Sequence, residues 1–154
     1  MDTLAITLVP PRDRGDRAWL TLRSGLFPDR PEPEHLEDMT ASLARGHYLR
    51  LALAIATGTP AGYVEAAKRT DYVNGTSSSP VAFLEELYVA PEFRRRGVAR
   101  ALVESVVEWA RREGCAELAS DSLLDNAAAH AAHRALGFEE TERVVYFRRT
   151  LGGV

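Results

Sequence analysis

The chain has 154 residues, about the length of one domain, and we expect a single domain over residues 1–154. Its composition, 45% hydrophobic and 27% charged, is ordinary for a globular protein and argues against a disordered or membrane class. The formal net charge of -3 argues against a general nucleic-acid binder, because such proteins need a positive field.

The start of the chain predicts a cytoplasmic protein. Met1-Asp2-Thr3-Leu4 lacks the basic and then apolar order of a secretory signal, and no apolar run approaches transmembrane length. Cys115 is the only cysteine, so no intramolecular disulfide can form and nothing suggests an oxidising compartment.

The N-terminal half is expected to contain strands and two helices. A short strand from Ala5 to Val9 precedes Pro10 and Pro11, which are expected to start a helix from Arg12 to Ser24. A second helix is predicted from Pro33 to Ala44. The segment from Tyr48 to Ala56 and the segment from Ala61 to Lys68 are predicted to form a hairpin around a Gly-Thr-Pro turn.

The C-terminal half is expected to alternate strands and helices. A polar loop from Thr70 to Pro80 leads into a central strand, Val81 to Val89. Apolar residues at helical spacing then predict a helix that begins near Val98 and stops at Gly114. The remaining predictions are a strand from Cys115 to Ser120, a helix from Asn126 to about Leu136, and a strand from Arg143 to Thr150 that closes the sheet.

The junction after the central strand is suited to hold a polyphosphate. Free backbone N–H groups at a helix start carry partial positive charge, Gly97 lets the backbone approach a ligand closely, and Arg94, Arg95 and Arg96 add full charges. The absence of Gly-Lys-Ser/Thr and of double-glycine spacing argues against the two common nucleotide loops. A solvated arginine run before an ordinary helix is the alternative.

Two patterns in this half are typical of one family. The run V-x-P-x-x-R-x-x-G-x-A, which begins at Val89, resembles the acyl-CoA-binding motif of the GNAT superfamily of N-acetyltransferases. Asn126, Ala129 and Leu136-Gly137-Phe138 resemble its second motif, and residues 71–75, 79–85, 119–121 and 137–144 are similar to its aminoglycoside 6'-N-acetyltransferases. The resemblance implies an α+β fold with a central mixed, mostly antiparallel twisted sheet flanked by helices.

The resemblance also implies how acetyl-CoA binds. It assigns the pantetheine arm to the main chain of Leu87, Tyr88 and Val89, and an amide contact to Asn126, which a simple N-cap role would also explain. It assigns the pyrophosphate to six residues of the junction: Arg95, Arg96, Gly97, Val98, Ala99 and Arg100. Where many superfamily members place a tyrosine that protonates the departing thiolate, this chain has His133, so either His133 serves or the thiolate leaves without help.

Glu85 and Asp121 are the candidate catalytic residues. An amine acceptor is mostly protonated at neutral pH, so a base must accept its proton, and carboxylates at neighbouring strand ends can do this. Taken alone, the pair would be explained by an outward-facing strand residue and a capping or turn residue. In the resembled branch the matching positions bind the aminoglycoside amines, and one is proposed as the base; the sequence does not decide which.

Phe27, Tyr72 and Glu142 are further substrate contacts that the resemblance implies. An aromatic face against a sugar ring is physically reasonable, although both aromatic residues would also serve as loop anchors and Glu142 as a surface charge.

The resembled enzymes are usually homodimers. Cys115 is read as a small buried thiol rather than a nucleophile, and His130 and His133 lack the further ligands of a metal site.

Three functions compete on this sequence. The favoured one is an aminoglycoside 6'-N-acetyltransferase that uses acetyl-CoA, without a metal, and confers resistance. The second keeps the enzyme but changes the acceptor to a polyamine, a small metabolite or a protein amine, because fold and cofactor do not fix the acceptor. The third is a non-catalytic acyl-CoA-binding domain, which would not need a carboxylate-lined amine pocket.

Overall fold

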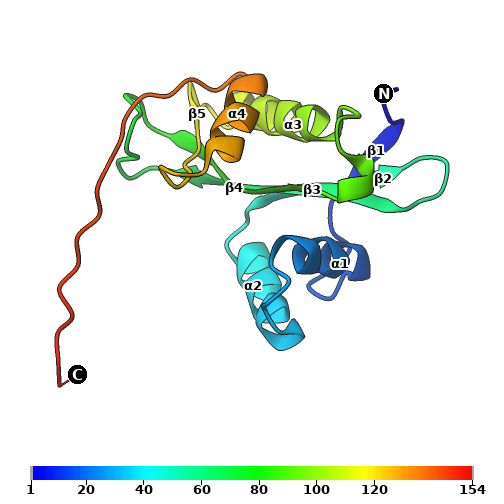
Figure 1. Ribbon diagram of the computed structural model, residues 1–154, viewed down its shortest axis with the longest axis horizontal. Coiled ribbons are helices and arrows are strands. Elements are labelled where there is room, and N and C mark those ends of the chain that lie inside the picture. The colour runs from blue at the N-terminus through cyan, green and yellow to red at the C-terminus, as the bar shows by residue number, and fades with distance from the viewer. Residues whose placement is uncertain (1, 154) are drawn as a thin grey trace. The chain divides into compact units, whose positions relative to one another are not determined.

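Five strands form one sheet within residues 2–120 of the computed structural model, in the order β1-β2-β3-β4-β5 (Figure 1). They are β1 (Ile6–Val9), β2 (Tyr48–Ala54), β3 (Pro60–Arg69), β4 (Val81–Val89) and β5 (Leu118–Ala119). The first four pair antiparallel, and β5 pairs parallel to β4. The mixed, mostly antiparallel sheet confirms the fold class expected from the sequence.

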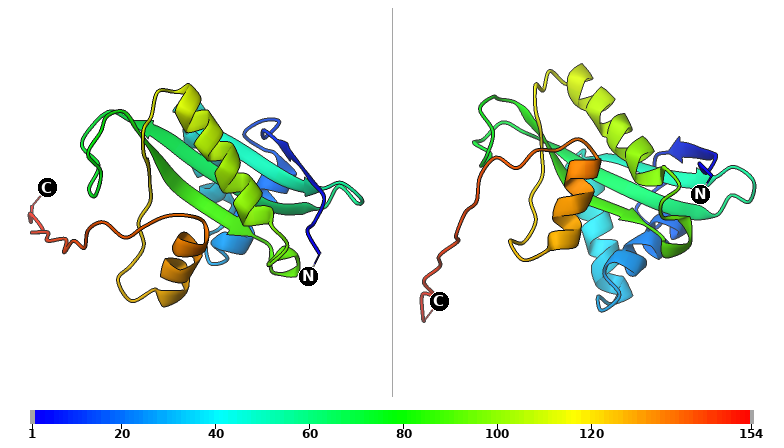
Figure 2. Two further views of the ribbon diagram at one scale, coloured as in Figure 1. Left: turned by 90° about the horizontal axis from the view of Figure 1, so that it is seen from above. Right: turned by 45° about the horizontal axis from the view of Figure 1, so that its top comes forward.

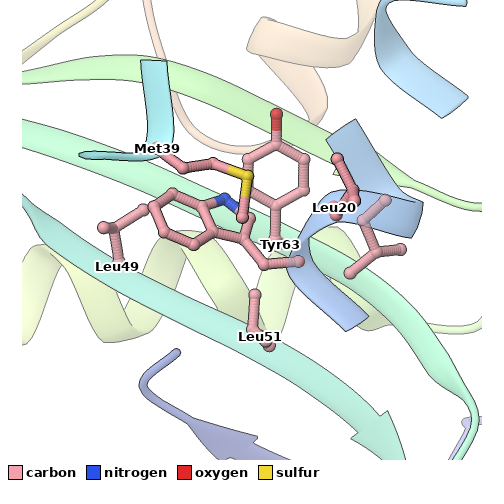
Figure 3. Close-up of a cluster of buried hydrophobic side chains, with 7 residues drawn as sticks. Leu20, Met39, Leu49, Leu51 and Tyr63 are labelled. Atoms are coloured by element: carbon pink, nitrogen blue, oxygen red, sulfur yellow. The ribbon is translucent and has the colours of Figure 1, made fainter. Parts of the chain in front are cut away.

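Helices cover both faces of this sheet. Figures 1 and 2 show α1 (Arg17–Leu26) and α2 (Glu32–Ala44) on one face and α3 (Val98–Arg112) along the other. On the first face, Leu20, Met39, Leu49, Leu51 and Tyr63 pack together with Trp19 and Leu22 (Figure 3). On the second face, α3 buries Val98, Leu102, Val103, Val106 and Ala110, which recur at helical spacing. Packing of helices on both faces therefore holds the sheet in place, and with it the path of β4.

The structure describes residues 2–153, which divide after Ser120 into two units. The second unit contains α4 (Ala127–Ala135). Within residues 2–153, no helix is long and apolar enough to cross a bilayer. The single domain expected over residues 1–154 stays a prediction.

The first helix begins later than the sequence suggested. Pro10 and Pro11 do not start it; Asp16 does, because its carboxylate accepts hydrogen bonds from the backbone N–H of Trp19 at 3.1 Å and of Arg12 at 2.8 Å. Burial works to raise the pKa of Asp16, but these backbone donors outweigh it and hold the pKa below its usual value. The helix starts where a cap is available.

Cys115 precedes β5 rather than beginning it. Its N–H donates to the carbonyl of Ala110 at 2.9 Å, while Gly114 adopts φ 79°, so the two residues close the C-terminal end of α3. Cys115 is 8% exposed, and burial raises the pKa of its thiol. The buried, non-nucleophilic role expected for Cys115 agrees with this environment, although its expected place in a strand was wrong.

The strand expected from Arg143 to Thr150 is also wrong. These residues form no strand in the described chain, and Val145, Tyr146 and Phe147 are 75%, 79% and 92% exposed. A strand needs a neighbouring strand to pair its backbone groups, which local residue preference cannot supply. The segment is strand-like in composition and unpaired.

Candidate active site

The basic loop after β4 has an unusual backbone that the sequence only partly predicts. A short 3-10 helix, η1 (Pro91–Phe93), leads to Arg95 with φ 61° and Gly97 with φ 84°, both left-handed. Gly97 is the N-cap of α3 and offers no side-chain acceptor to the first helical N–H groups. Left-handed residues before a helix start turn successive N–H groups toward one point, which suits an anion.

Three hydrogen bonds hold this loop in place. The N–H of Leu4 donates to the carbonyl of Arg96 at 3.0 Å, Arg96 Nε donates to the carbonyl of Asp2 at 3.3 Å, and Arg94 Nε donates to the carbonyl of Val89 at 3.0 Å. A non-glycine residue in the left-handed region costs about 1–3 kcal/mol, and such strain concentrates at functional sites. Arg95 and Arg100 remain exposed around the loop.

The second half of β4 has an open edge. β5 pairs with β4 only at Ala82 and Phe83, and within residues 2–120 no strand continues this pairing along residues 84–89. Backbone groups that point away from β3 on this stretch suit a ligand that carries amides, except the carbonyl of Val89, which accepts a hydrogen bond from Nε of Arg94. Leu87, Tyr88 and Val89, expected to contact the pantetheine arm, lie on this stretch.

A β-bulge lies at Glu85. On β3, Glu65 pairs with Glu86 and the next residue, Ala66, pairs with Leu84, so Glu85 is the extra residue of β4. A bulge bends its strand and redirects a side chain. Glu85 is exposed and interacts electrostatically with the guanidinium of Arg69, whereas Glu86 is half-buried. The candidate base thus lies at a bend at the start of the open edge of β4.

The two aromatic candidates differ in their surroundings. Tyr72 is 72% exposed in the loop between β3 and β4. Phe27 follows α1, and the guanidinium carbons of Arg23 and Arg30 lie 5.5 and 5.1 Å from its ring centroid. A shallow cavity of about 410 Å³ here is lined by Leu26, Phe27, Pro28, Asp29, Arg30 and Glu34.

Sequence reasoning missed a buried ion pair beneath the bulge. Arg23 of α1 is 2% exposed, and its Nη1 lies 2.6 and 2.9 Å from the two carboxylate oxygens of Glu86. Burial raises the pKa of Glu86 despite the neighbouring guanidinium, and it raises the pKa of Tyr63, whose hydroxyl lies 3.3 Å from the same carboxylate. The available signal was the position of Arg23, four residues after Trp19 and three after Leu20, which places it on the apolar face of the expected helix.

The remaining candidates belong to the second unit. Asn126 is the N-cap of α4, with its Oδ1 accepting the N–H of Ala129 at 3.0 Å, which confirms the capping role. His133 Nδ1 lies 2.6 Å from the carbonyl of Ala129. A carbonyl only accepts, so Nδ1 carries the hydrogen, and the ring can give a proton from Nε2 only as the imidazolium. Asp121 and Glu142 are exposed.

The structure therefore brings together one part of the expected site. Glu85, the residues of the open edge and the basic loop follow one another along β4 and into α3. Asp121, Asn126, His133 and Glu142 lie in the other unit, and their approach to Glu85 stays a prediction.

The chain is similar to known acetyltransferases in both sequence and structure. Residues 17–138 match the acetyltransferase (GNAT) family. An aminoglycoside N(6')-acetyltransferase type 1 of Stenotrophomonas maltophilia is 54% identical over 134 residues, which cover 87% of this chain and 86% of that protein. The crystal structure of an aminoglycoside antibiotic 6'-N-acetyltransferase from Acinetobacter baumannii superposes with a TM-score of 0.89 at 44% identity, covering 96% of this chain and 100% of the other. A structure of an aminoglycoside N-acetyltransferase in complex with CoA has a TM-score of 0.82 at 40% identity, covering 98% of this chain and 97% of the other.

Proposed function

Because the chain belongs to the GNAT family of acetyltransferases, we propose that it transfers the acetyl group of acetyl-CoA to the 6'-amine of aminoglycoside antibiotics and so confers resistance. The observation that carries this proposal is the high identity, over most of both chains, to an aminoglycoside N(6')-acetyltransferase. The same acceptor is supported by carboxylates at three of the expected positions, Glu85, Asp121 and Glu142, which would attract a polycation.

The pyrophosphate of acetyl-CoA binds over the left-handed loop and the start of α3. The N–H groups at the start of α3 and the side chains of Arg95, Arg96 and Arg100 supply the positive field. The amides of the pantetheine arm pair with the open edge of β4 at residues 87–89, as an added strand would. Asn126 adds an amide contact from the second unit.

The reaction is a direct transfer. The neutral 6'-amine attacks the thioester carbonyl, a C–N bond forms, the C–S bond breaks, and CoA leaves as a thiolate that takes a proton from His133 in its imidazolium form or from water. Glu85 or Asp121 accepts the proton that the amine loses. Phe27 and Tyr72 contact the sugar rings. No metal takes part, since amine, thioester and carboxylate supply all the chemistry.

Thiol release from acetyl-CoA tests the function directly. Kanamycin and tobramycin, which carry a 6'-amine, should be acetylated, whereas an aminoglycoside with a 6'-hydroxyl should not, because it offers no amine there. Glu85→Gln and Asp121→Asn should lower turnover while leaving acetyl-CoA affinity nearly unchanged. Glu104→Gln, on the exposed side of α3, is the matched control. Acetyl-CoA binding without acetylation of any 6'-amine would overturn the assignment.

We also propose that the enzyme is a homodimer that works in the cytoplasm. The C-terminal arm, residues 143–150, supports a dimer because it combines strand-forming residues with high exposure of Val145, Tyr146 and Phe147. A second copy supplies the partner strand that the arm lacks. Sedimentation should give a dimer for the wild type and a monomer for Phe147→Asp; a monomeric wild type would contradict the proposal. The buried free thiol of Cys115 is consistent with a reducing compartment.

A further inference from the structure

The bulge at Glu85 is anchored from below by its neighbour. The side chain of Glu86 is 15% exposed, and it accepts hydrogen bonds from Nη1 of Arg23 on both of its oxygens. Tyr63 of β3 adds its hydroxyl at 3.3 Å. One peptide separates Glu86 from Glu85, so whatever holds the Glu86 carboxylate also limits where the bulge can lie.

The anchor itself is fixed at its other end. Nη2 of Arg23 donates to Oδ2 of Asp38 on α2 at 3.0 Å, and Arg30 contacts the same carboxylate. The guanidinium therefore joins α1, α2 and β4 through two carboxylates, while its side chain is 2% exposed. The buried guanidinium has few alternative positions, because leaving the largely buried carboxylate of Glu86 would strand both charges without compensation, while the partly exposed Asp38 holds its other end.

We propose that Arg23 is a positioning residue for catalysis: by holding Glu86, it fixes the bulge of β4 and so aims the carboxylate of Glu85 at the acceptor amine. This inference rests on the proposed function for the role of Glu85. It assigns to Arg23 no contact with either substrate. Its effect on rate comes through geometry, since small misplacements of a catalytic group cost large factors in rate.

The single variant Arg23→Met should lower kcat by roughly 10- to 100-fold, the loss expected from a misplaced catalytic group. The affinity for acetyl-CoA should change less than kcat, because Leu87 alone of the proposed pantetheine contacts lies in the loosened stretch and the basic loop is held by its own contacts to Leu4 and Val89. Arg17→Met is the matched control, since Arg17 lies on the same helix with its side chain 78% exposed. It should leave kcat unchanged.

A paired variant separates positioning from stability. Arg23→Met alone leaves Glu86 buried without its cation and should lower Tm. Combining Arg23→Met with Glu86→Gln removes both charges yet keeps an acceptor for Tyr63, so Tm should return toward the wild-type value. If Arg23 positions the bulge, kcat stays low in this paired variant. Recovery of kcat together with Tm would overturn the proposal and leave Arg23 a purely structural role.

Amide hydrogen exchange gives a readout that needs no substrate. The N–H groups of residues 84–87 should exchange faster in both Arg23 variants than in the wild type and the Arg17 control. Unchanged exchange in a variant with lowered kcat would also overturn the proposal. Failure of the wild type to acetylate any 6'-amine would instead refute the proposed function, while the exchange result would still report on the anchor.

Discussion

Substitution of Gly97 separates the two properties that the basic loop needs for the proposed binding of pyrophosphate, its backbone conformation and its charge. Gly97 has φ 84°, and among residues 2–153 an added Cβ would meet only Cγ2 of Thr3, at 3.5 Å. The cost of Gly97→Ala is therefore conformational rather than steric. A left-handed non-glycine residue costs about 1–2 kcal/mol, which for a chain of this size lowers Tm by roughly 2–8 °C.

Gly97→Asp adds a negative charge to the same backbone position. Aspartate tolerates the left-handed region better than alanine, so this variant should be no less stable than Gly97→Ala. Two like charges about 4 Å apart repel by about 1 kcal/mol in water and about 4 kcal/mol near a protein surface. Acetyl-CoA should then bind roughly 5-fold to several hundred-fold more weakly.

Titration calorimetry of both variants with acetyl-CoA decides the matter. We expect Gly97→Ala to bind within a small factor of wild type and Gly97→Asp to bind far more weakly, with a deficit that shrinks as salt is raised. Equal affinity for the two variants, both folded by circular dichroism, would refute the placement of the pyrophosphate over Gly97.

Three further predictions concern the fold and the thiol. Asp16→Ala should cost about 1 kcal/mol at neutral pH through the lost cap. Because the pKa of Asp16 in the folded state lies below its ordinary value of 3.8, the stability difference between wild type and Asp16→Ala should be complete above pH 3.8. It should vanish as the pH falls through the folded-state pKa, and urea unfolding at several pH values checks this. Gly62→Ala would place Cβ 2.5 Å from the carbonyl oxygen of Tyr88 and should cost about 1–3 kcal/mol of unfolding free energy, whereas Gly152→Ala, whose Cβ meets no atom of the described residues within 4 Å, should be neutral. Cys115→Ala should keep kcat close to wild type, since burial raises the pKa of the thiol; a covalent acetyl-enzyme seen by mass spectrometry would contradict this.

The sequence predicted the segment from β4 through α3 best because its signals are local. A run of apolar residues, a proline, a glycine in the left-handed region and helical spacing up to Gly114 lie within one stretch of chain. The N-cap at Asn126 was equally local and was also confirmed. Such features need no knowledge of distant residues.

The errors arose where a competing local bond or a distant partner decides the structure. Helix α1 begins after its cap Asp16 and not at the prolines. Cys115 lies outside β5 because its N–H donates to the carbonyl of Ala110 at the end of α3. The strand at Arg143–Thr150 failed because pairing depends on a neighbour.

The bulge, and the pairing of Arg23 with Glu86 that anchors it, could not be predicted from the sequence. The bulge is a property of the register between β3 and β4, and the anchor joins residues 63 positions apart. Neither residue type nor spacing in one segment fixes such a pairing.

The open edge of β4 has a consequence for inhibitors and for the evolution of resistance. A ligand that bonds the main chain of residues 87–89 depends on atoms that every amino acid except proline presents alike. A compound built to mimic the pantetheine amides would therefore be hard to escape by substitution at these positions. Under the proposed binding of acetyl-CoA to this edge, a proline that abolished binding of the compound would also weaken binding of the enzyme's own acetyl donor.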